Sequence, residues 1–258
     1  RDLHLSLRRQ RQMCIRDSRW GGRLFACDRL IAVHDPTRIP RLIEALQRAW
    51  EGQPDLTLAQ LIGVLENSGL GWGTTDEEAV ELLTAMEREH PSIIDATSGP
   101  HAITTVNPPH LVTITNRYVV VRNGADPERM PAVWRMGGMR KAGPGLPLVI
   151  ADAEGVEHRL GIVSLITRLE GAPEASISTP RADVGNRRWL VLFDDGARAV
   201  VGQRIRIWRM GRRSVVSERL AWSDILRCEP GAEMEIAPAG GGKPRTLGLV
   251  KLVLELER

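Results

Sequence analysis

The spacing of the apolar residues changes once along this chain, at Asn107-Pro108-Pro109, and this change constrains the fold more than any other feature. Before it, apolar residues recur every three or four positions, which is typical of helices buried on one face. After it, short apolar runs are separated by turn residues, which is typical of strands. We therefore expect an α+β fold, in which a small three-helix module is followed by an antiparallel β-rich module, a sandwich or a barrel.

Three short helices are predicted between residues 35 and 90. Asp35-Pro36 opens the first helix, and Thr57 and Thr75 each begin a capping-box pattern that opens the second and the third. Because each helix is apolar on one side, the three sides must be buried together or against a partner. The residues expected on the buried sides are Ile39, Leu42, Ile43, Leu46, Trp50, Leu58, Leu61, Ile62, Leu65, Ala79, Leu82, Leu83 and Met86.

The helical segment resembles a group of small, uncharacterised bacterial helical proteins. The resemblance implies a helical fold and a bacterial source, but it implies no activity, and no functional residue is carried over from that group. It is confined to residues 35–90. It rests on Arg38-Ile39-Pro40-Arg41-Leu42-Ile43-Glu44-Ala45-Leu46, on Ala49-Trp50, on Pro54-Asp55-Leu56-Thr57-Leu58-Ala59-Gln60-Leu61 and on Asp76-Glu77-Glu78.

The module boundaries follow from the same patterns. The helical module is expected to span residues 35–106, with or without a terminal hairpin, and the β-rich module residues 108–258. A stretch rich in Ala, Pro, Ser and Gly at 170–186 is expected to be a loop or a boundary between two sub-domains. Hairpin turns are predicted at 152–155 and 194–196, where glycine permits a positive φ. Strands are predicted at 111–122, 146–151, 156–160, 189–193, 197–201, 204–208 and 247–257.

Residues 1–18 resemble the translation of a DNA sequencing adapter. Residues 8–18 match one reading frame of a transposon-type library adapter, and residues 1–4 match the flow-cell sequence that precedes it. We therefore expect this segment to be an artefact in a metagenomic sequence, and we exclude it from the folded protein. Residues 19–34 are expected to be a leader segment. If a GTG codon encodes Val33, we expect Val33 to be the natural initiator and residues 19–32 to be untranslated.

Removing the adapter segment changes the charge balance. The chain has 35 Lys and Arg residues against 32 Asp and Glu residues. Residues 1–18 hold five arginines and two aspartates, so 30 residues of each sign remain. The net charge therefore gives no reason to expect a polyanionic partner.

The cysteines and the hydropathy indicate a location. Outside the adapter segment, only Cys27 and Cys228 remain, far apart in the sequence. They imply no disulfide framework, so we expect a reducing compartment and a cytoplasmic protein. No run approaches the roughly 18 apolar residues that a membrane span needs, so we expect no membrane contact.

No residue is predicted to be catalytic, to bind a cofactor or to bind a metal. The spacing of His90, His101 and His110 matches no metal signature. Two basic segments beside tryptophans are candidates for contact with single-stranded nucleic acid. The alternative is a plain alternating strand, in which Ile205 and Ile207 point inward while Arg204, Arg206 and Trp208 share the other face. The candidate nucleic-acid residues are Trp134, Arg135, Arg140, Trp208, Arg209, Arg212 and Arg213.

Three functions are compatible with these patterns. The first is a non-enzymatic protein-binding or regulatory protein, in which the three-helix module docks a protein partner and the β-rich module is a scaffold or a second binding surface. The alternative is a nucleic-acid-binding protein that uses the Arg/Trp segments. The third is a hydrolase of unknown substrate that uses the histidines between residues 90 and 110. The sequence favours the first, because it has good core patterning and no convergent catalytic set.

Overall fold

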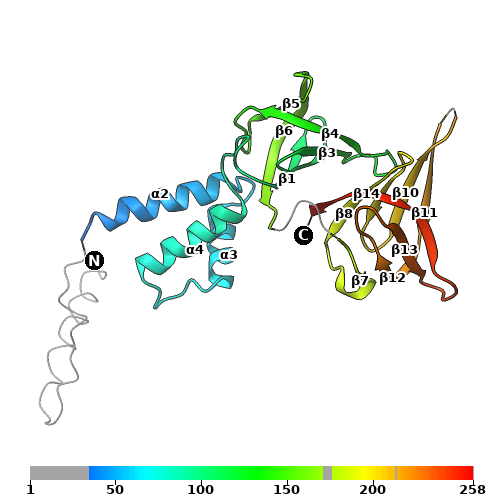
Figure 1. Cartoon of the computed structure of the whole chain (residues 1–258). Coiled ribbons are helices and arrows are strands. Elements are labelled where there is room, and N and C mark those ends of the chain that lie inside the picture. Colours follow the sequence, from blue (N-terminus) through cyan, green and yellow to red (C-terminus); the bar gives the residue numbers. More distant parts are fainter. Residues whose placement is uncertain (1–34, 171–175, 213, 258) are drawn as a thin grey trace, which may run out of the picture. The chain divides into compact units, whose positions relative to one another are not determined.

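The computed structural model describes residues 35–170, 176–212 and 214–257. The predictions for the adapter segment, for residues 19–34 and for Val33 lie outside these residues. Three helices are followed by many antiparallel strands, which form a closed barrel and an open sheet (Figure 1). The expected α+β fold is therefore confirmed. Among the described residues, no helix has the length and the apolar character that crossing a membrane requires.

The three predicted helices are present as α2 (Arg38–Glu51), α3 (Leu58–Asn67) and α4 (Asp76–Glu89). Both predicted capping boxes are formed. The Thr75 main-chain N–H donates to Glu78 Oε2 over 2.7 Å, and Thr75 Oγ1 accepts from the Glu78 N–H at 3.3 Å. These bonds satisfy donors that the first turn of a helix otherwise leaves unpaired, so they fix where α4 begins.

The buried side of α2 differs from the predicted one. Ile39 and Ile43 are 50% and 54% exposed, and Leu58 of α3 is 47% exposed, so the prediction that these three are buried is wrong. The small residues Ala45 and Ala49 are buried instead, because α2 packs against its neighbours through them. Leu42 and Leu46 flank them at helical spacing. The helical core consists of Ala45, Ala49, Leu61, Leu65, Leu83 and Met86.

The barrel consists of six antiparallel strands in sequence order, and pairing between the first and the last closes it. Its core contains Ile103, Val112, Leu148 and Ile166. Ile94, which follows α4, adds to this core by pairing with Ala142 through two main-chain hydrogen bonds. The strands are β1 (His101–Val106), β2 (His110–Ile114), β3 (Tyr118–Asn123), β4 (Ala132–Met139), β5 (Pro147–Asp152) and β6 (Glu157–Arg168).

The start of the barrel departs from the sequence patterns in two ways. The predicted strand at 111–122 is in fact two strands, β2 and β3, which pair with each other. The chain reverses without a glycine, because Thr115 Oγ1 accepts hydrogen bonds from the main chain of Arg117 and Tyr118. In addition, β1 pairs with β2 and β6, so the barrel begins before Pro108.

The second β structure is an eight-stranded antiparallel sheet in the order β11-β10-β9-β8-β14-β13-β12-β7. The connection from the barrel to this sheet runs from Arg168 to Thr179 and overlaps the stretch at 170–186. The predicted turns at 152–155 and 194–196 join β5 to β6 and β8 to β9, with positive φ at Gly155 and Gly196. The strands are β7 (Thr179–Pro180), β8 (Arg188–Phe193), β9 (Arg198–Val201), β10 (Ile205–Met210), β11 (Val215–Leu220), β12 (Trp222–Arg227), β13 (Glu233–Pro238) and β14 (Arg245–Glu257).

Strand β14 joins the two halves of this sheet. Its first part pairs with β13, and its second part, from Val250 to Glu257, pairs with β8. Gly248, which lies in the first part and pairs with Met234, has a φ of 149°, and a Cβ there would lie 3.1 Å from Phe193 Cδ1. Glycine is therefore favoured there, shortly before β14 begins to pair with β8 at Val250.

Strands β8 and β14 are apolar on both faces. One face lies in the core of the sheet, with Trp189 and Val253. The other packs against the barrel through a separate apolar cluster. The buried hydroxyl of Thr113 in β2 also donates to the Leu256 carbonyl over 3.1 Å. The barrel and the sheet are therefore held together by a dry contact formed by Val120, Leu190, Leu252, Leu254 and Leu256, with Tyr118, Val133, Leu192 and Val200 at its margin.

Shortening one leucine of this contact should destabilise the protein. Leu254 is fully buried, so we expect Leu254→Ala to lower the free energy of unfolding by about 2–5 kcal/mol, because the lost methyl groups leave a cavity. Urea denaturation measures this change. The matched control is Leu226→Ala, since Leu226 is 45% exposed, and it should change the free energy by less than about 0.5 kcal/mol. Equal losses in the two variants would contradict the assignment of Leu254 to a packed contact.

Candidate anion-binding cleft

A cleft of about 790 Å³ lies where the barrel meets the sheet. Its walls come from β3 and the loop that follows it on the barrel side, and from β8, β9, β10 and β11 on the sheet side. Among its lining residues, Glu257 is the single carboxylate. The lining contains seven arginines, which are Arg122, Arg129, Arg187, Arg188, Arg204, Arg206 and Arg219.

Two carboxylates bind four of these guanidinium groups. Glu257 pairs with Arg122 and with Arg188, whose Nε lies 3.0 Å from Glu257 Oε2. Glu128, in the loop between β3 and β4, pairs with Arg206 over 2.9 Å and also with Arg219. Because arginine stays protonated at physiological pH, the cleft has more positive than negative charge. Within the described part of the chain, Arg129, Arg187 and Arg204 have no carboxylate partner.

Burial lowers the pKa of one arginine of the cleft, Arg122. The Arg122 side chain is 10% exposed, and burial lowers its pKa, while the neighbouring Glu257 carboxylate opposes this effect. Removing a charge from water is costly unless a partner compensates for it. Arg122 therefore depends on Glu257, whereas the exposed Arg204 is solvated without a partner of this kind.

Two tryptophans orient guanidinium groups in the cleft. The Arg187 Cζ atom lies 5.3 Å from the ring centroid of Trp189, and the Arg206 Cζ atom lies 5.9 Å from that of Trp208. Both distances are within the range of cation–π attraction. The two rings are themselves only 5% and 3% exposed. They therefore hold the arginines in place and offer no open face on which a base could stack.

The cleft contains one of the seven candidate nucleic-acid residues, Trp208. On β4 of the barrel, Trp134 stacks on His158 with ring centroids 4.5 Å apart, and Arg135 is exposed. Arg140, directly after β4, pairs with Glu157 over 2.7 Å. The structure thus places the two basic segments on different β structures.

The remaining candidate nucleic-acid residues are Arg209, which lies in β10, and Arg212 and Arg213, which follow it in the sequence. Arg209 donates to the Leu247 carbonyl over 3.1 Å, and Arg212 is exposed after β10. Arg213 lies outside the described residues. The predicted alternation along β10 is confirmed, because Ile205 and Ile207 are buried in the core of the sheet, while Arg206 and Trp208 face the cleft.

The sequence reasoning missed five arginines of the cleft. Arg122, Arg188 and Arg219 lie at or next to the end of a strand, and Arg129 and Arg187 lie in loops. Only Arg187 and Arg188 are adjacent in the sequence. A charged residue that ends an apolar run, as Arg122 does in β3, was the available signal. The missed residues are Arg122, Arg129, Arg187, Arg188 and Arg219.

The three histidines of the hydrolase hypothesis do not converge on one point. The Nδ1 atoms of His90, His101 and His110 lie 3.0, 3.0 and 3.3 Å from the carbonyl oxygens of Ile166, Gly99 and Leu160. Each ring thus contacts a different part of the main chain. Within the described ranges, no group of three or more His, Cys, Asp or Glu side chains is arranged to hold a metal ion.

Cys228, the free cysteine within the described residues, has an unreactive thiol. Burial raises the pKa of Cys228 to about 12, so at neutral pH the group is a thiol and not the nucleophilic thiolate. Its position in the core of the sheet gives it the role of a small apolar residue.

His101 should make the stability of the protein depend on pH. Burial lowers its pKa from the ordinary value of 6.5, so the unfolded chain takes up this proton more readily than the folded protein. The free energy of unfolding should therefore decrease as the pH falls below 6.5 and through the folded pKa. Urea denaturation at a series of pH values measures this slope. His101→Gln, which cannot titrate, should reduce the slope, and an unchanged slope would show that His101 is not responsible.

No protein-family model matches the chain, and no curated protein matches it either. The resemblance of residues 35–90 to small bacterial helical proteins therefore stays an expectation, and the arginine cleft is the feature from which a function is inferred.

Proposed function

We propose that this is a non-enzymatic binding protein and that the arginine cleft binds an acidic segment of a partner protein. The observation that carries this proposal is the excess of seven arginines over one carboxylate in the cleft lining. Such an excess is unfavourable unless an anion or the solvent compensates for it, and a cleft between two rigid β structures can hold an anion in a fixed position.

The chemistry of the cleft suits carboxylates and peptide carbonyls. Its guanidinium groups already bind two carboxylates of the same chain, those of Glu128 and Glu257. Arg206 also donates to the Pro127 carbonyl, and Arg187 to the Asp183 carbonyl over 2.6 Å. The planar guanidinium presents its donors as a fork that fits a carboxylate with two parallel hydrogen bonds. An acidic peptide supplies both kinds of acceptor.

Nucleic acid is the second candidate ligand, because phosphate oxygens suit the same donors. One observation favours the acidic protein segment over it. Single-stranded nucleic acid is usually held by exposed aromatic side chains, and the two tryptophans beside the cleft arginines are buried.

The structure bears differently on the three-helix module, the hydrolase hypothesis and the cytoplasmic location. The three-helix module, on which Ile39 and Ile43 are exposed, is the surface that the sequence favoured for a protein partner. The hydrolase hypothesis receives no support from the three histidines, since each contacts a separate main-chain carbonyl. A cytoplasmic location is part of the proposal and agrees with a buried, free Cys228.

Binding of labelled hexaglutamate at low salt tests the proposal. We expect Arg204→Ala to weaken this binding by about tenfold or more, since a hydrogen bond between charged groups contributes about 1.5–3 kcal/mol. Fluorescence anisotropy measures the affinity. Arg204 is exposed and has no carboxylate partner in the described chain, so the variant should keep the fold. Arg212→Ala is the matched control, because Arg212 is exposed but does not line the cleft.

Three results would overturn the proposal. The first is binding of single-stranded oligothymidylate without binding of hexaglutamate, which would favour the nucleic-acid function. The second is binding of neither probe to the wild-type protein. The third is an equal effect of Arg204→Ala and Arg212→Ala on hexaglutamate binding, which would place the binding surface outside the cleft.

A further inference from the structure

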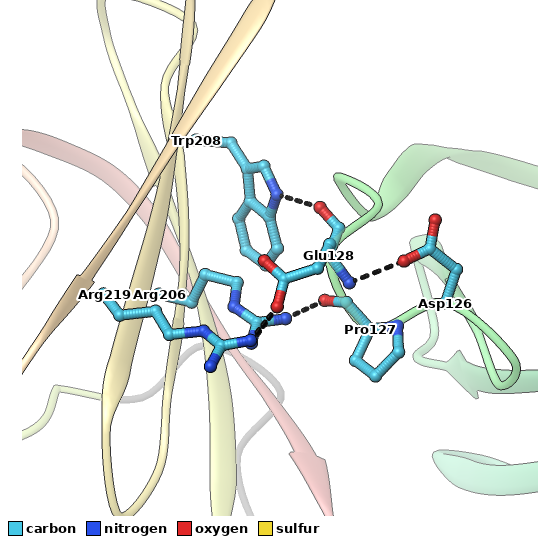
Figure 2. A network of polar contacts seen from close by, with 6 residues as sticks. All are labelled: Asp126, Pro127, Glu128, Arg206, Trp208 and Arg219. Carbon is cyan, nitrogen blue, oxygen red and sulfur yellow. Dashed lines mark hydrogen bonds and ion pairs between the residues drawn. The ribbon is translucent and has the colours of Figure 1, made fainter.

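The chain's own loop covers part of the arginine cleft. The segment Asp126-Pro127-Glu128 lies between β3 and β4 and is exposed to solvent on its outer side. Figure 2 shows this segment opposite Arg206, Trp208 and Arg219, which come from β10 and β11 of the sheet. The loop therefore meets the face of the sheet that a ligand in the cleft would also contact.

Three side chains of the sheet bind this segment as they would bind a peptide. Arg206 donates to the Pro127 carbonyl, and the Trp208 indole N–H donates to the Glu128 carbonyl over 2.7 Å. The Glu128 carboxylate accepts from both Arg206 and Arg219. The sheet thus binds the carbonyls of Pro127 and Glu128 and the Glu128 carboxylate together. A short acidic peptide presents this set of acceptors, whereas an isolated ion does not.

The loop is held in this shape locally. Asp126 Oδ1 accepts a hydrogen bond from the Glu128 main-chain N–H at 3.0 Å, and Asn123 Oδ1 accepts from the N–H of Asp126 at 2.9 Å. Side-chain oxygens that bind the main chain two or three residues ahead stabilise tight turns. The turn presents the Pro127 carbonyl to Arg206 and the Glu128 carbonyl to Trp208.

The fit between the loop and its site is incomplete. The Arg206 Nε–H is buried and finds no acceptor among the described residues. Both ion pairs of Glu128 use the same atom, Oε1. A buried donor without an acceptor costs free energy, and one oxygen shared between two guanidinium groups leaves them partly satisfied. A ligand with a better placed or additional carboxylate would bind these groups more completely than the loop does.

We propose that Arg206, Trp208 and Arg219 form a peptide-recognition site that the chain's own Pro127-Glu128 segment occupies until an acidic segment of a partner displaces it. This inference rests on the proposed function and adds to it the chemistry of the ligand and a competitor within the chain. The ligand is a short peptide that presents a carboxylate and two adjacent main-chain carbonyls. The loop acts as an autoinhibitory contact, because the donors that bind it are those that the partner requires.

Removing the Glu128 charge should therefore increase the affinity for an external acidic peptide. A tethered competitor reduces the apparent affinity by the fraction of molecules in which the site is free. Glu128→Gln keeps the size of the side chain but weakens both ion pairs. We expect this variant to bind hexaglutamate about tenfold more tightly than the wild-type protein. Glu154→Gln is the matched control, because Glu154 is exposed on the β5–β6 turn and does not line the cleft.

The experiment compares hexaglutamate affinities of the wild-type protein, Glu128→Gln and Glu154→Gln by anisotropy, with thermal unfolding of each variant to confirm folding. Hydrogen exchange of residues 124–131 in the wild-type protein is measured with and without the peptide. The inference predicts tighter binding for Glu128→Gln alone and faster exchange of this loop when the peptide is bound.

The outcomes separate the inference from the function on which it rests. Equal affinity of all three proteins with unchanged exchange would overturn the inference and leave the proposed function in place. Absence of hexaglutamate binding to any of them would overturn both. A wild-type dimer that Glu128→Gln converts to a monomer would show that the loop occupies the site of a second copy, and it would also overturn the inference.

Discussion

The structure depends on two neighbouring strands, β8 and β14, that are apolar on both faces. A strand of this kind cannot lie at a surface, because each exposed face would leave apolar area in water. The remaining strands of the sheet cover one face, and the barrel covers the other through Val120 and its neighbours. The contact between the barrel and the sheet is thus a hydrophobic core of its own, separate from the cores inside the barrel and the sheet.

The same two strands determine where the charged cleft begins. Leu190, Leu254 and Leu256 are buried in the contact, and the last pair along β8 and β14 is Arg188 with Glu257. Arg122, near the end of β3, meets them there. Apolar burial therefore ends at the ion pairs of Glu257 with Arg122 and Arg188, and these residues also line the cleft. The position of the cleft follows from where the apolar surface of these strands stops.

The elements predicted correctly from the sequence are those that are determined by residues close together in the chain. The capping boxes at Thr57 and Thr75 and the glycine turns of the two hairpins are fixed by nearby residues. The reversal at Thr115 had no glycine to indicate it, and β11, β12 and β13 were not predicted. The cleft could not be predicted, because its arginines come from strands far apart in the sequence and only strand pairing brings them together. The face of β10 that bears Arg206 was predicted, whereas the loop opposite it was not.

The order of the strands has a consequence for how the chain reaches its native state. Strand β14 lies between β8 and β13, although it follows both in the sequence. Until β14 is in place, β8–β11 and β12–β13 are not joined by strand pairing, and the edges of β8 and β13 are open. Pairs such as Trp189 with Glu255 join distant parts of the chain, so folding is expected to be slow and to leave those edges open to aggregation in the meantime. Strand β14 completes the core of the sheet and also covers the edges of β8 and β13. The rate at which β14 pairs therefore determines how long these edges can associate with other chains.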